Sequence, residues 1–285
     1  MKLGLCTTDF TVRPADALFG RLTELGVGVT QFAFCSVLES DFTPDESIEI
    51  PESIPAEAMR AIAREARRHA VAITAINGTF NMCHPDEEVR MEGVKRFAVL
   101  CEAAGALGCR ILSLCSGTRS RTSLWTYDAH NGDPDAWHDM SESMKRVCEL
   151  ASAHDLTLAI ETEASNIIDT PEKARRILDE VGYDGLKMIL DAANLFLPGK
   201  AKRENVIPTL DHAFELFGKD IVLAHGKDIR ESDGIDFCAA GEGIVDFAYM
   251  TERLKKQGYD GDFMLHGIYS EEKMPHSLAL IRQYL

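Results

Sequence analysis

Four apolar runs in the second half of the chain each end in a side chain that can bind a metal ion. The runs are residues 158–161, 188–191, 221–225 and 263–266, and they end in Glu161, Asp191, His225 and His266. Short continuous apolar runs of about four to eight residues are typical of buried strands. A charged or imidazole residue that ends such a run stands at the carboxyl end of its strand. Two carboxylates and two imidazoles that meet there would form a four-ligand site for one divalent cation.

The segments that hold these residues belong to a strand–helix alternation that runs along the whole chain. Expected strands cover residues 2–7, 28–34, 71–76, 110–115, 156–161, 186–191, 221–225 and 262–266, with an acidic loop at 39–52. Expected helices cover residues 15–25, 55–70, 86–107, 134–154, 170–182, 204–217, 245–257 and 277–285. Strands that alternate with helices indicate parallel βαβ units. Eight units predict an α/β fold, a single (β/α)8 TIM barrel over residues 1–285, since such barrels take about 250 residues.

An open doubly wound sheet is the other arrangement of such units. It is disfavoured because no G-x-G-x-x-G motif follows the first strand, and the glycine pair at 241–243 lies in a loop without the phosphate-binding context. In a barrel, active sites lie at the carboxyl ends of the strands. The four ligand candidates end expected strands five to eight, and neighbouring strands lie about 4.8 Å apart. They can therefore reach one ion, provided that their side chains point inward.

Composition limits the classes of partner. The formal net charge is −16, from 46 acidic and 30 basic residues, which argues against nucleic acid and against an anionic membrane surface. The sequence has no apolar run of about 18 residues, so no transmembrane helix is expected, and the apolar part of the N-terminus is too short for a signal peptide. The eight cysteines lie mostly in apolar runs without a C-x-x-C pair, which favours reduced thiols and a cytoplasmic location.

Five motifs lie at or near the ends of the later expected strands. They are AIET at 159–162, LDAAN at 190–194, HGKD at 225–228, GEGIVDF at 241–247 and GYDG at 258–261. In their order and spacing, these motifs resemble those of the xylose-isomerase-like TIM barrels, the sugar phosphate isomerase/epimerase group, and the resemblance covers nearly the whole chain. It implies a small carbohydrate substrate, a possible homo-oligomer, and one divalent metal ion (Mn²⁺, Mg²⁺, Co²⁺ or Zn²⁺) held by Glu161, Asp191 and His225.

The last expected strand departs from the family pattern. The family usually has a glutamate there that binds the metal and often moves a proton, whereas this chain has His266. A histidine can still be a ligand, and a set of two carboxylates and two histidines favours Zn²⁺ or Mn²⁺ over Mg²⁺. The substitution weakens the case for an epimerisation in which two carboxylates flank the substrate carbon. Glu161 is the first candidate for proton transfer and His266 is the second.

The function that we expect by resemblance is a metal-dependent isomerase or epimerase that acts on a sugar or sugar phosphate through a metal-bound enediolate. The same chemistry also serves lyases, so a dehydratase, decarboxylase or β-eliminating enzyme on a keto-sugar or sugar acid is the alternative. A second alternative is a non-catalytic binding subunit in which His266 marks a lost active site. Product mass separates the first two, because isomerisation conserves it.

Further residues are candidate substrate contacts, each with a structural alternative. Lys227 could contact a substrate oxygen or form a salt bridge on the barrel rim. Arg119 and Arg121 could bind a phosphate or carboxylate, although solvated loop charges are commoner. Trp125 could provide an apolar floor for a sugar ring. The remaining candidates are Asn194, which could reach the pocket or shape its loop, and His84, which could line the mouth or form a helix-entry turn.

Overall fold

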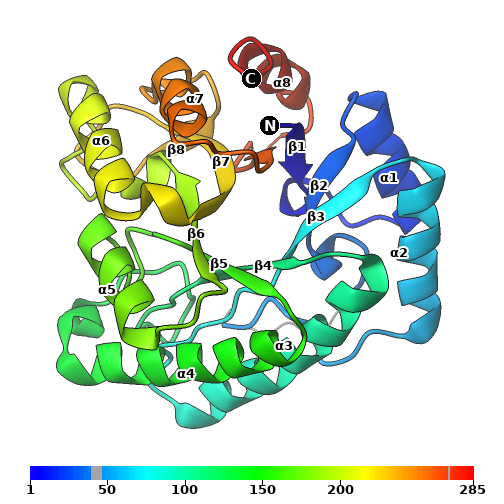
Figure 1. Cartoon of the computed structure of the whole chain (residues 1–285), viewed down its shortest axis with the longest axis horizontal. Coiled ribbons are helices and arrows are strands. Elements are labelled where there is room, and N and C mark those ends of the chain that lie inside the picture. The colour runs from blue at the N-terminus through cyan, green and yellow to red at the C-terminus, as the bar shows by residue number, and fades with distance from the viewer. Residues whose placement is uncertain (40–46, 269) are drawn as a thin grey trace.

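Eight parallel strands close into a barrel (Figure 1). The structure, a computed structural model, describes residues 1–39, 47–268 and 270–285, so part of the expected acidic loop lies outside the described residues. Each strand pairs with the next along the chain, β6 pairs with β7, and β9 lies between β7 and β1 and completes the ring. The barrel predicted from the sequence is confirmed. Its strands are β1 (Leu3–Cys6), β2 (Val29–Phe32), β3 (Ala72–Asn77), β4 (Ile111–Cys115), β5 (Thr157–Glu161), β6 (Leu186–Asp191), β7 (Ile221–Ile229) and β9 (Phe263–Leu265).

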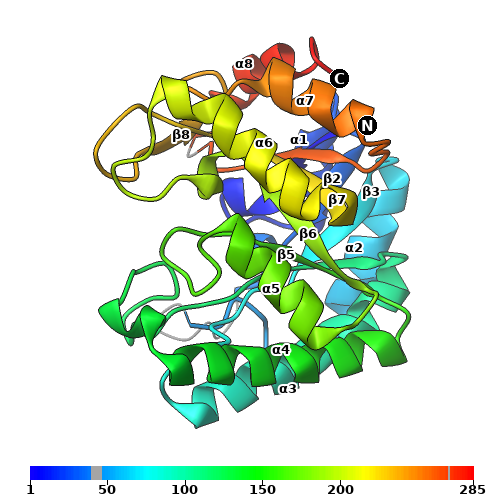
Figure 2. The same cartoon turned by 60° about the vertical axis from the view of Figure 1, so that its left-hand side comes forward.

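The α-helices of the described residues surround the barrel (Figures 1 and 2). They are α1 (Ala15–Glu24), α2 (Ala56–Arg68), α3 (Glu87–Leu107), α4 (Pro134–Ala153), α5 (Pro171–Val181), α6 (Val206–Phe217), α7 (Phe247–Lys256) and α8 (Met274–Ile281). Local signals explain their ends. Thr170 accepts a hydrogen bond from the Lys173 backbone N–H at the start of α5, and Gly182 ends that helix with a left-handed φ of 62°.

The barrel strands face two separate cores. One large core fills the space between the strands and the helices. A small core comprises seven strand residues: Cys6, Val29, Ala75, Ala159, Ile189, Leu223 and Met264. Because side chains alternate between the two faces of a strand, these residues identify the inward face of each strand that contributes one. The small core therefore fills the barrel interior beneath its carboxyl end.

Strand β7 is longer than the sequence predicts. It continues past residue 225 to Ile229, because the short strand β8 (Phe237–Ala239) folds back and pairs with it in antiparallel orientation. The two strands form a hairpin in which Lys227 lies opposite Ala239 and Ile229 lies opposite Phe237. This hairpin carries Lys227 and Phe237 beyond the last residues of the barrel sheet.

Asp228 holds the loop that follows the hairpin. Its carboxylate accepts hydrogen bonds from the backbone N–H groups of Ile229, Gly241, Gly243 and Val245 at 2.9–3.0 Å. Gly243 permits this approach, since a Cβ there would lie 2.3 Å from the Asp228 Oδ1 atom. The carboxylate thus replaces regular secondary structure as the acceptor for these N–H groups.

Replacing Asp228 with alanine is expected to lower the free energy of unfolding by about 3 kcal/mol, because four backbone N–H groups would lose their common acceptor, a buried carboxylate. Urea denaturation measures this change. The matched control is Asp236→Ala, which removes an exposed carboxylate paired with Arg230 and is expected to cost under about 1 kcal/mol. Equal losses in the two variants would contradict this role for Asp228.

In the described part of the chain, no helix has both the length and the apolar character that crossing a bilayer requires. All eight cysteines are free of disulfide bonds and seven of them are buried. Burial raises the pKa of the Cys83 and Cys148 thiols to about 12. These thiols therefore stay protonated at neutral pH and act as packing residues.

Candidate metal centre

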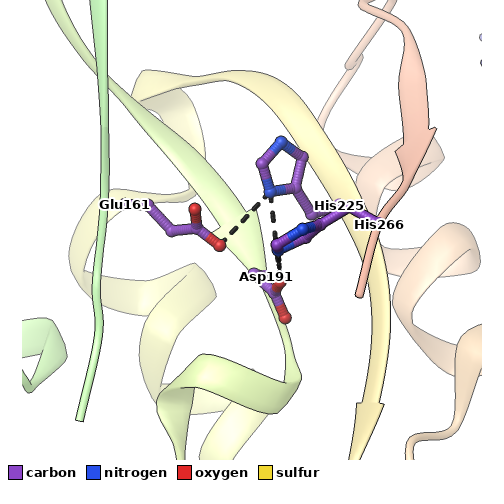
Figure 3. Close-up of side chains that lie close together, drawn as sticks. All are labelled: Glu161, Asp191, His225 and His266. Carbon is purple, nitrogen blue, oxygen red and sulfur yellow. Dashed lines mark hydrogen bonds and ion pairs between the residues drawn. The ribbon is translucent and has the colours of Figure 1, made fainter. Parts of the chain in front are cut away.

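The four expected ligands meet at the carboxyl end of the barrel. One ligand atom from each of Glu161, Asp191, His225 and His266 lies within 4.8 Å of the others (Figure 3). Glu161, Asp191 and His225 are buried, while the His266 side chain is 25% exposed. The cluster is thus closed on the barrel side and reachable from the mouth at His266.

The alternation of side chains explains why all four point inward. Each ligand follows an inward residue of the small core by two positions: Ala159 and Glu161, Ile189 and Asp191, Leu223 and His225, Met264 and His266. Two residues along a strand return a side chain to the same face. The inward orientation, which the sequence-based prediction required, is therefore a property of the strands that end in these residues.

The ligand atoms lie close together, and one pair of them, on His225 and Glu161, is at hydrogen-bond distance. The His225 Nδ1 atom lies 3.2 Å from the Glu161 Oε1 atom and 4.0 Å from the Asp191 Oδ2 atom. The His266 Nε2 atom lies 3.6 Å from the Asp191 Oδ2 atom. The two imidazole rings are tilted by 58° with centroids 4.9 Å apart. A tetrahedral ion with bonds of about 2.1 Å spaces its ligands by roughly 3.4 Å, so this arrangement is close to what one ion needs.

Two ligand atoms lack a hydrogen-bond partner among the described residues. The Asp191 Oδ2 and His266 Nε2 atoms are buried and make no hydrogen bond there. Buried polar atoms are almost always satisfied, and two carboxylates that face one point repel each other. A divalent cation between the four side chains would satisfy both atoms and neutralise both carboxylates. The oxygen and nitrogen donors are those of zinc and manganese sites, so the residues fit a metal ion.

Gln31 fixes which nitrogen of His225 faces the cluster. The Gln31 Oε1 atom lies 2.8 Å from the His225 Nε2 atom, and the Gln31 amide nitrogen donates to the Ser113 hydroxyl at 3.1 Å. The Gln31 oxygen therefore accepts the Nε2 proton, which leaves the Nδ1 atom facing the cluster, 3.2 Å from the Glu161 Oε1 atom. A proton or a divalent cation can lie between these two atoms. Sequence analysis missed Gln31, although a polar residue that ends an apolar strand was a usable signal.

Charge in the cluster keeps Glu161 ionised. Burial would raise the pKa of Glu161, but the nearby His225, His266 and Lys227 outweigh it and hold that pKa well below its ordinary value. Glu163, two residues farther along, shows the opposite result: burial raises its pKa more than Lys227 lowers it. The environment therefore favours the ionised form of Glu161 and the neutral form of Glu163, although both residues lie at or just beyond the carboxyl end of β5.

Asn194 orients one ligand and is held by another. Its amide nitrogen donates to the Glu161 Oε1 atom at 2.7 Å, and the Asp191 Oδ1 atom accepts from the Ala193 and Asn194 backbone N–H groups at 2.9 and 3.3 Å. The short 3₁₀ turn Ala193–Leu195 positions all of these groups. The expected contact of Asn194 with the pocket is thus a contact with a candidate ligand.

Replacing Asn194 with alanine is expected to weaken metal affinity by about 10- to 100-fold, because groups that orient metal ligands typically contribute that much. Competition against a metallochromic chelator measures the affinity. Asn205→Ala removes an amide that bonds to the Lys200 backbone carbonyl and should leave the affinity unchanged. Unchanged affinity in Asn194→Ala would show that Glu161 needs no such support.

Comparison with known proteins identifies the family. Residues 35–284 match the model of the xylose isomerase-like TIM barrel family. The chain belongs to this family. The match extends over most of the barrel and includes all four residues of the cluster.

Among curated relatives, an epimerase and a dehydratase are similar to this family member. L-ribulose-5-phosphate 3-epimerase UlaE of Shigella flexneri serotype 5b (strain 8401) is 24% identical over 188 residues, which are 65% of this chain and 60% of that protein. Inosose dehydratase of Geobacillus thermodenitrificans (strain NG80-2) is 20% identical over 138 residues, which are 45% of this chain and 46% of that protein. Both alignments span less than two thirds of the relative.

A solved structure has the same fold over the whole chain. The IOLI protein, whose crystal structure contains a bound zinc atom, has a TM-score of 0.73 and 16% identity, with 100% of this chain and 99% of that chain covered. At this identity the likeness shows the shared barrel, and the case for a metal in this family member rests on its own cluster.

One basic residue, Lys227, and one aromatic residue, Trp125, lie beside the cluster. The Lys227 ammonium nitrogen lies 3.8 Å from the Asp191 Oδ2 atom, 3.8 Å from the Glu163 Oε2 atom and 3.9 Å from the centre of the Phe237 ring. The Trp125 indole N–H donates to the Glu49 carboxylate at 3.1 Å. Trp125 lines a hollow of about 200 Å³ together with Glu161, His225 and His266. Sequence analysis missed Glu49 and Glu163 as neighbours of the site.

The remaining candidates make their contacts elsewhere. The Arg119 guanidinium pairs with Asp139 at 2.7 Å and with Asp135 at 3.2 Å. Arg121 lines a different hollow, of about 650 Å³, that Arg119 and these two aspartates share. The His84 Nδ1 atom accepts a hydrogen bond from the Asp86 backbone N–H where α3 begins, which is the helix-entry turn that the sequence also allowed.

Proposed function

We propose that the chain is a divalent-metal-dependent isomerase or epimerase of a sugar or sugar phosphate. The observation that carries this proposal is the convergence of Glu161, Asp191, His225 and His266, with two buried ligand atoms that lack a hydrogen bond among the described residues. The donor set favours Mn²⁺ or Zn²⁺ over Mg²⁺ or Co²⁺. The curated epimerase relative supports the reaction class.

The chain's own residues would divide the reaction between them. A bound divalent ion would polarise a carbonyl and the neighbouring hydroxyl of the substrate, which acidifies the C–H bond between them. Glu161, kept ionised by its cationic neighbours, would take that proton, and Asn194 would hold its carboxylate in position. Lys227 would donate a hydrogen bond to a substrate oxygen that gains negative charge. His266 is the second candidate for proton transfer.

The proposed substrate contacts follow from the same geometry. Trp125, at the mouth, would pack against the apolar face of a sugar ring, and Asn194 and Lys227 would contact its oxygens. Arg119, Arg121 and His84 have no role in this proposal, because the structure gives them contacts at another hollow and at the start of α3. The strongly negative charge of the chain supports a small substrate rather than nucleic acid or a membrane surface. A cytoplasmic location and a homo-oligomer remain part of the proposal.

A lyase is the second candidate. Two observations favour it: the inosose dehydratase relative, and His266 in the position where the family usually has a second carboxylate. An imidazole can donate a proton to a departing hydroxyl group at neutral pH, whereas an ionised carboxylate cannot. Loss of water from the substrate would then follow removal of the same C–H proton.

Product analysis in D₂O tests the proposal. The protein, loaded with Mn²⁺ or Zn²⁺, is incubated with ketoses, aldoses and their phosphates, and products are examined by NMR and mass spectrometry. An isomerase or epimerase conserves the molecular formula and incorporates solvent deuterium at the reacting carbon. Loss of water or CO₂ would establish the lyase instead. A metal-loaded protein that neither exchanges nor transforms any sugar would favour the binding subunit.

A further inference from the structure

A second, larger hollow adjoins the metal centre. It encloses about 580 Å³. The hollow over the cluster, which we call the inner hollow, encloses about 200 Å³. The walls of the larger hollow are mainly apolar, with Glu163, Ser165 and Asp169 as polar groups. We call it the outer hollow; its apolar lining residues include Trp125, Tyr127, Leu197, Pro198, Ile235 and Phe237.

Two side chains join the outer hollow to the cluster. Trp125 lines both hollows. Phe237, which the β7–β8 hairpin carries beyond the barrel sheet, contacts Lys227, and Lys227 in turn lies 3.8 Å from the Asp191 Oδ2 atom. The outer hollow therefore adjoins the hollow over the cluster at Trp125, and a molecule bound at the cluster would have to extend past this side chain to enter it.

Size indicates that the substrate uses both hollows. Ligand-binding pockets typically measure about 300–1,000 Å³, and the inner hollow alone falls below this range. The inner hollow is lined by three of the four cluster residues, Glu161, His225 and His266, and would therefore take the reacting carbons. The outer hollow is large enough for a further ring attached to the reacting sugar.

The walls of the outer hollow indicate the chemistry of that ring. Trp125 and Tyr127 are 40% and 63% exposed, and they are two of the four large apolar side chains exposed in the described residues. Exposed aromatic faces beside carboxylates suit a sugar ring, whose C–H face packs on the aromatic ring while its hydroxyl groups donate to the carboxylates. Among the described lining residues there is no lysine or arginine. The two lysines beside the hollow are paired with its carboxylates: Lys173 lies 2.7 Å from Asp169, and Lys227 lies 3.8 Å from Glu163. The outer hollow is therefore unsuited to a phosphate group.

We propose that the substrate is a glycoside: the reacting sugar lies against the cluster and a second, neutral sugar ring linked to it packs between Trp125, Tyr127 and Phe237. This inference rests on the proposed function and narrows its substrate class. It assigns a binding role to the long β7 strand and to β8, which the barrel itself does not need. Tyr127 and Phe237 become determinants of specificity for the part of the substrate that does not react.

Fluorescence of a single tryptophan tests the proposal directly. The chain has two tryptophans, so Trp137→Phe leaves Trp125 as the only one. Trp137 belongs to α4, where it bonds to Glu180 and lies outside both hollows. This variant is titrated, with and without Mn²⁺, with glucose and fructose and with sucrose, maltose and cellobiose. At least one disaccharide is expected to change Trp125 emission and to bind at least tenfold more tightly than either monosaccharide.

A second substitution locates the bound ring. Tyr127→Ala in the same background is expected to weaken disaccharide binding about tenfold and to leave monosaccharide binding unchanged. Hexyl β-glucoside tests whether the outer hollow binds a sugar ring or an apolar group, because it carries an apolar chain in place of the second sugar. If hexyl β-glucoside binds more tightly than every disaccharide, or if no disaccharide binds more tightly than glucose and fructose, the proposal is overturned.

The Asp191→Asn variant, made on the Trp137→Phe background, separates this proposal from the proposed function. Disaccharide binding that persists without metal or turnover supports the outer hollow even if the metal enzyme is disproved. Turnover of a monosaccharide by the metal-loaded protein, with no preference for any disaccharide, would confirm the enzyme and overturn the glycoside proposal.

Discussion

Asp191→Asn is expected to abolish metal binding and to lower turnover by about 10³-fold, which corresponds to about 4 kcal/mol of activation barrier. Asp191 is fully buried, and its Oδ2 atom lies near His225, His266 and Lys227 without a hydrogen bond among the described residues. Asparagine keeps the acceptor for the Ala193 and Asn194 backbone N–H groups and removes only the charged ligand. The folded structure should therefore survive while the metal is lost.

Thermal unfolding with and without metal measures this effect without a substrate. Metal at 100 times its dissociation constant should stabilise the wild type by about 2.7 kcal/mol, which raises Tm by about 5 °C for a chain of this size. Asp191→Asn should show no such rise, while its metal-free unfolding free energy stays within about 1 kcal/mol of the wild type. Glu142→Gln, an exposed change on α4, is the matched control and should keep the full metal-induced rise. A normal rise in Asp191→Asn would remove Asp191 from the ligand set.

Glu161→Gln is expected to lower exchange of the substrate C–H proton by about 10³- to 10⁴-fold at saturating metal, since a positioned general base contributes up to about that factor. Glutamine keeps the size of the side chain and can still accept from the Asn194 amide, so the change isolates the negative charge. Solvent deuterium incorporation, followed by NMR, measures proton transfer separately from product release. Metal affinity is measured in parallel, because Glu161 also belongs to the cluster.

Two further variants identify the base if it is not Glu161. Glu163→Gln changes the next carboxyl group along the chain, whose pKa burial raises and which pairs with Lys227. His266→Gln changes the second proton-transfer candidate. Proton exchange that persists in Glu161→Gln and disappears in one of these variants would transfer the role to that residue.

The barrel and the cluster could be predicted because their signals are local. Each of the four ligands ends an apolar run, and parallel strands bring their carboxyl ends to one edge. The inward orientation also follows from sequence once the apolar residues two positions earlier, such as Ala159 before Glu161, are assigned to the barrel interior. The family resemblance then added the expected reaction class, which spacing alone does not give.

The surroundings of the cluster could not be predicted because they depend on contacts between distant residues. Gln31 meets His225 across 194 residues, and nothing near either residue indicates this pair. The ion pair of Arg119 could not be predicted from its own loop, because its partner Asp139 lies on the next helix, α4. The extension of β7 was missed because Lys227 and Asp228 interrupt its apolar pattern, and only pairing with β8 makes this segment a strand.

Anomalous diffraction from crystals grown with Zn²⁺ or Mn²⁺ tests the central claim, that four strand-end residues hold one ion. We expect a single strong peak between Glu161, Asp191, His225 and His266, with bonds of about 2.0–2.2 Å to oxygen and nitrogen atoms. His225 should bind through Nδ1, because Gln31 accepts the Nε2 proton. A saturated crystal without a peak at this position, or with an ion that neither Asp191 nor His225 contacts, would contradict the claim.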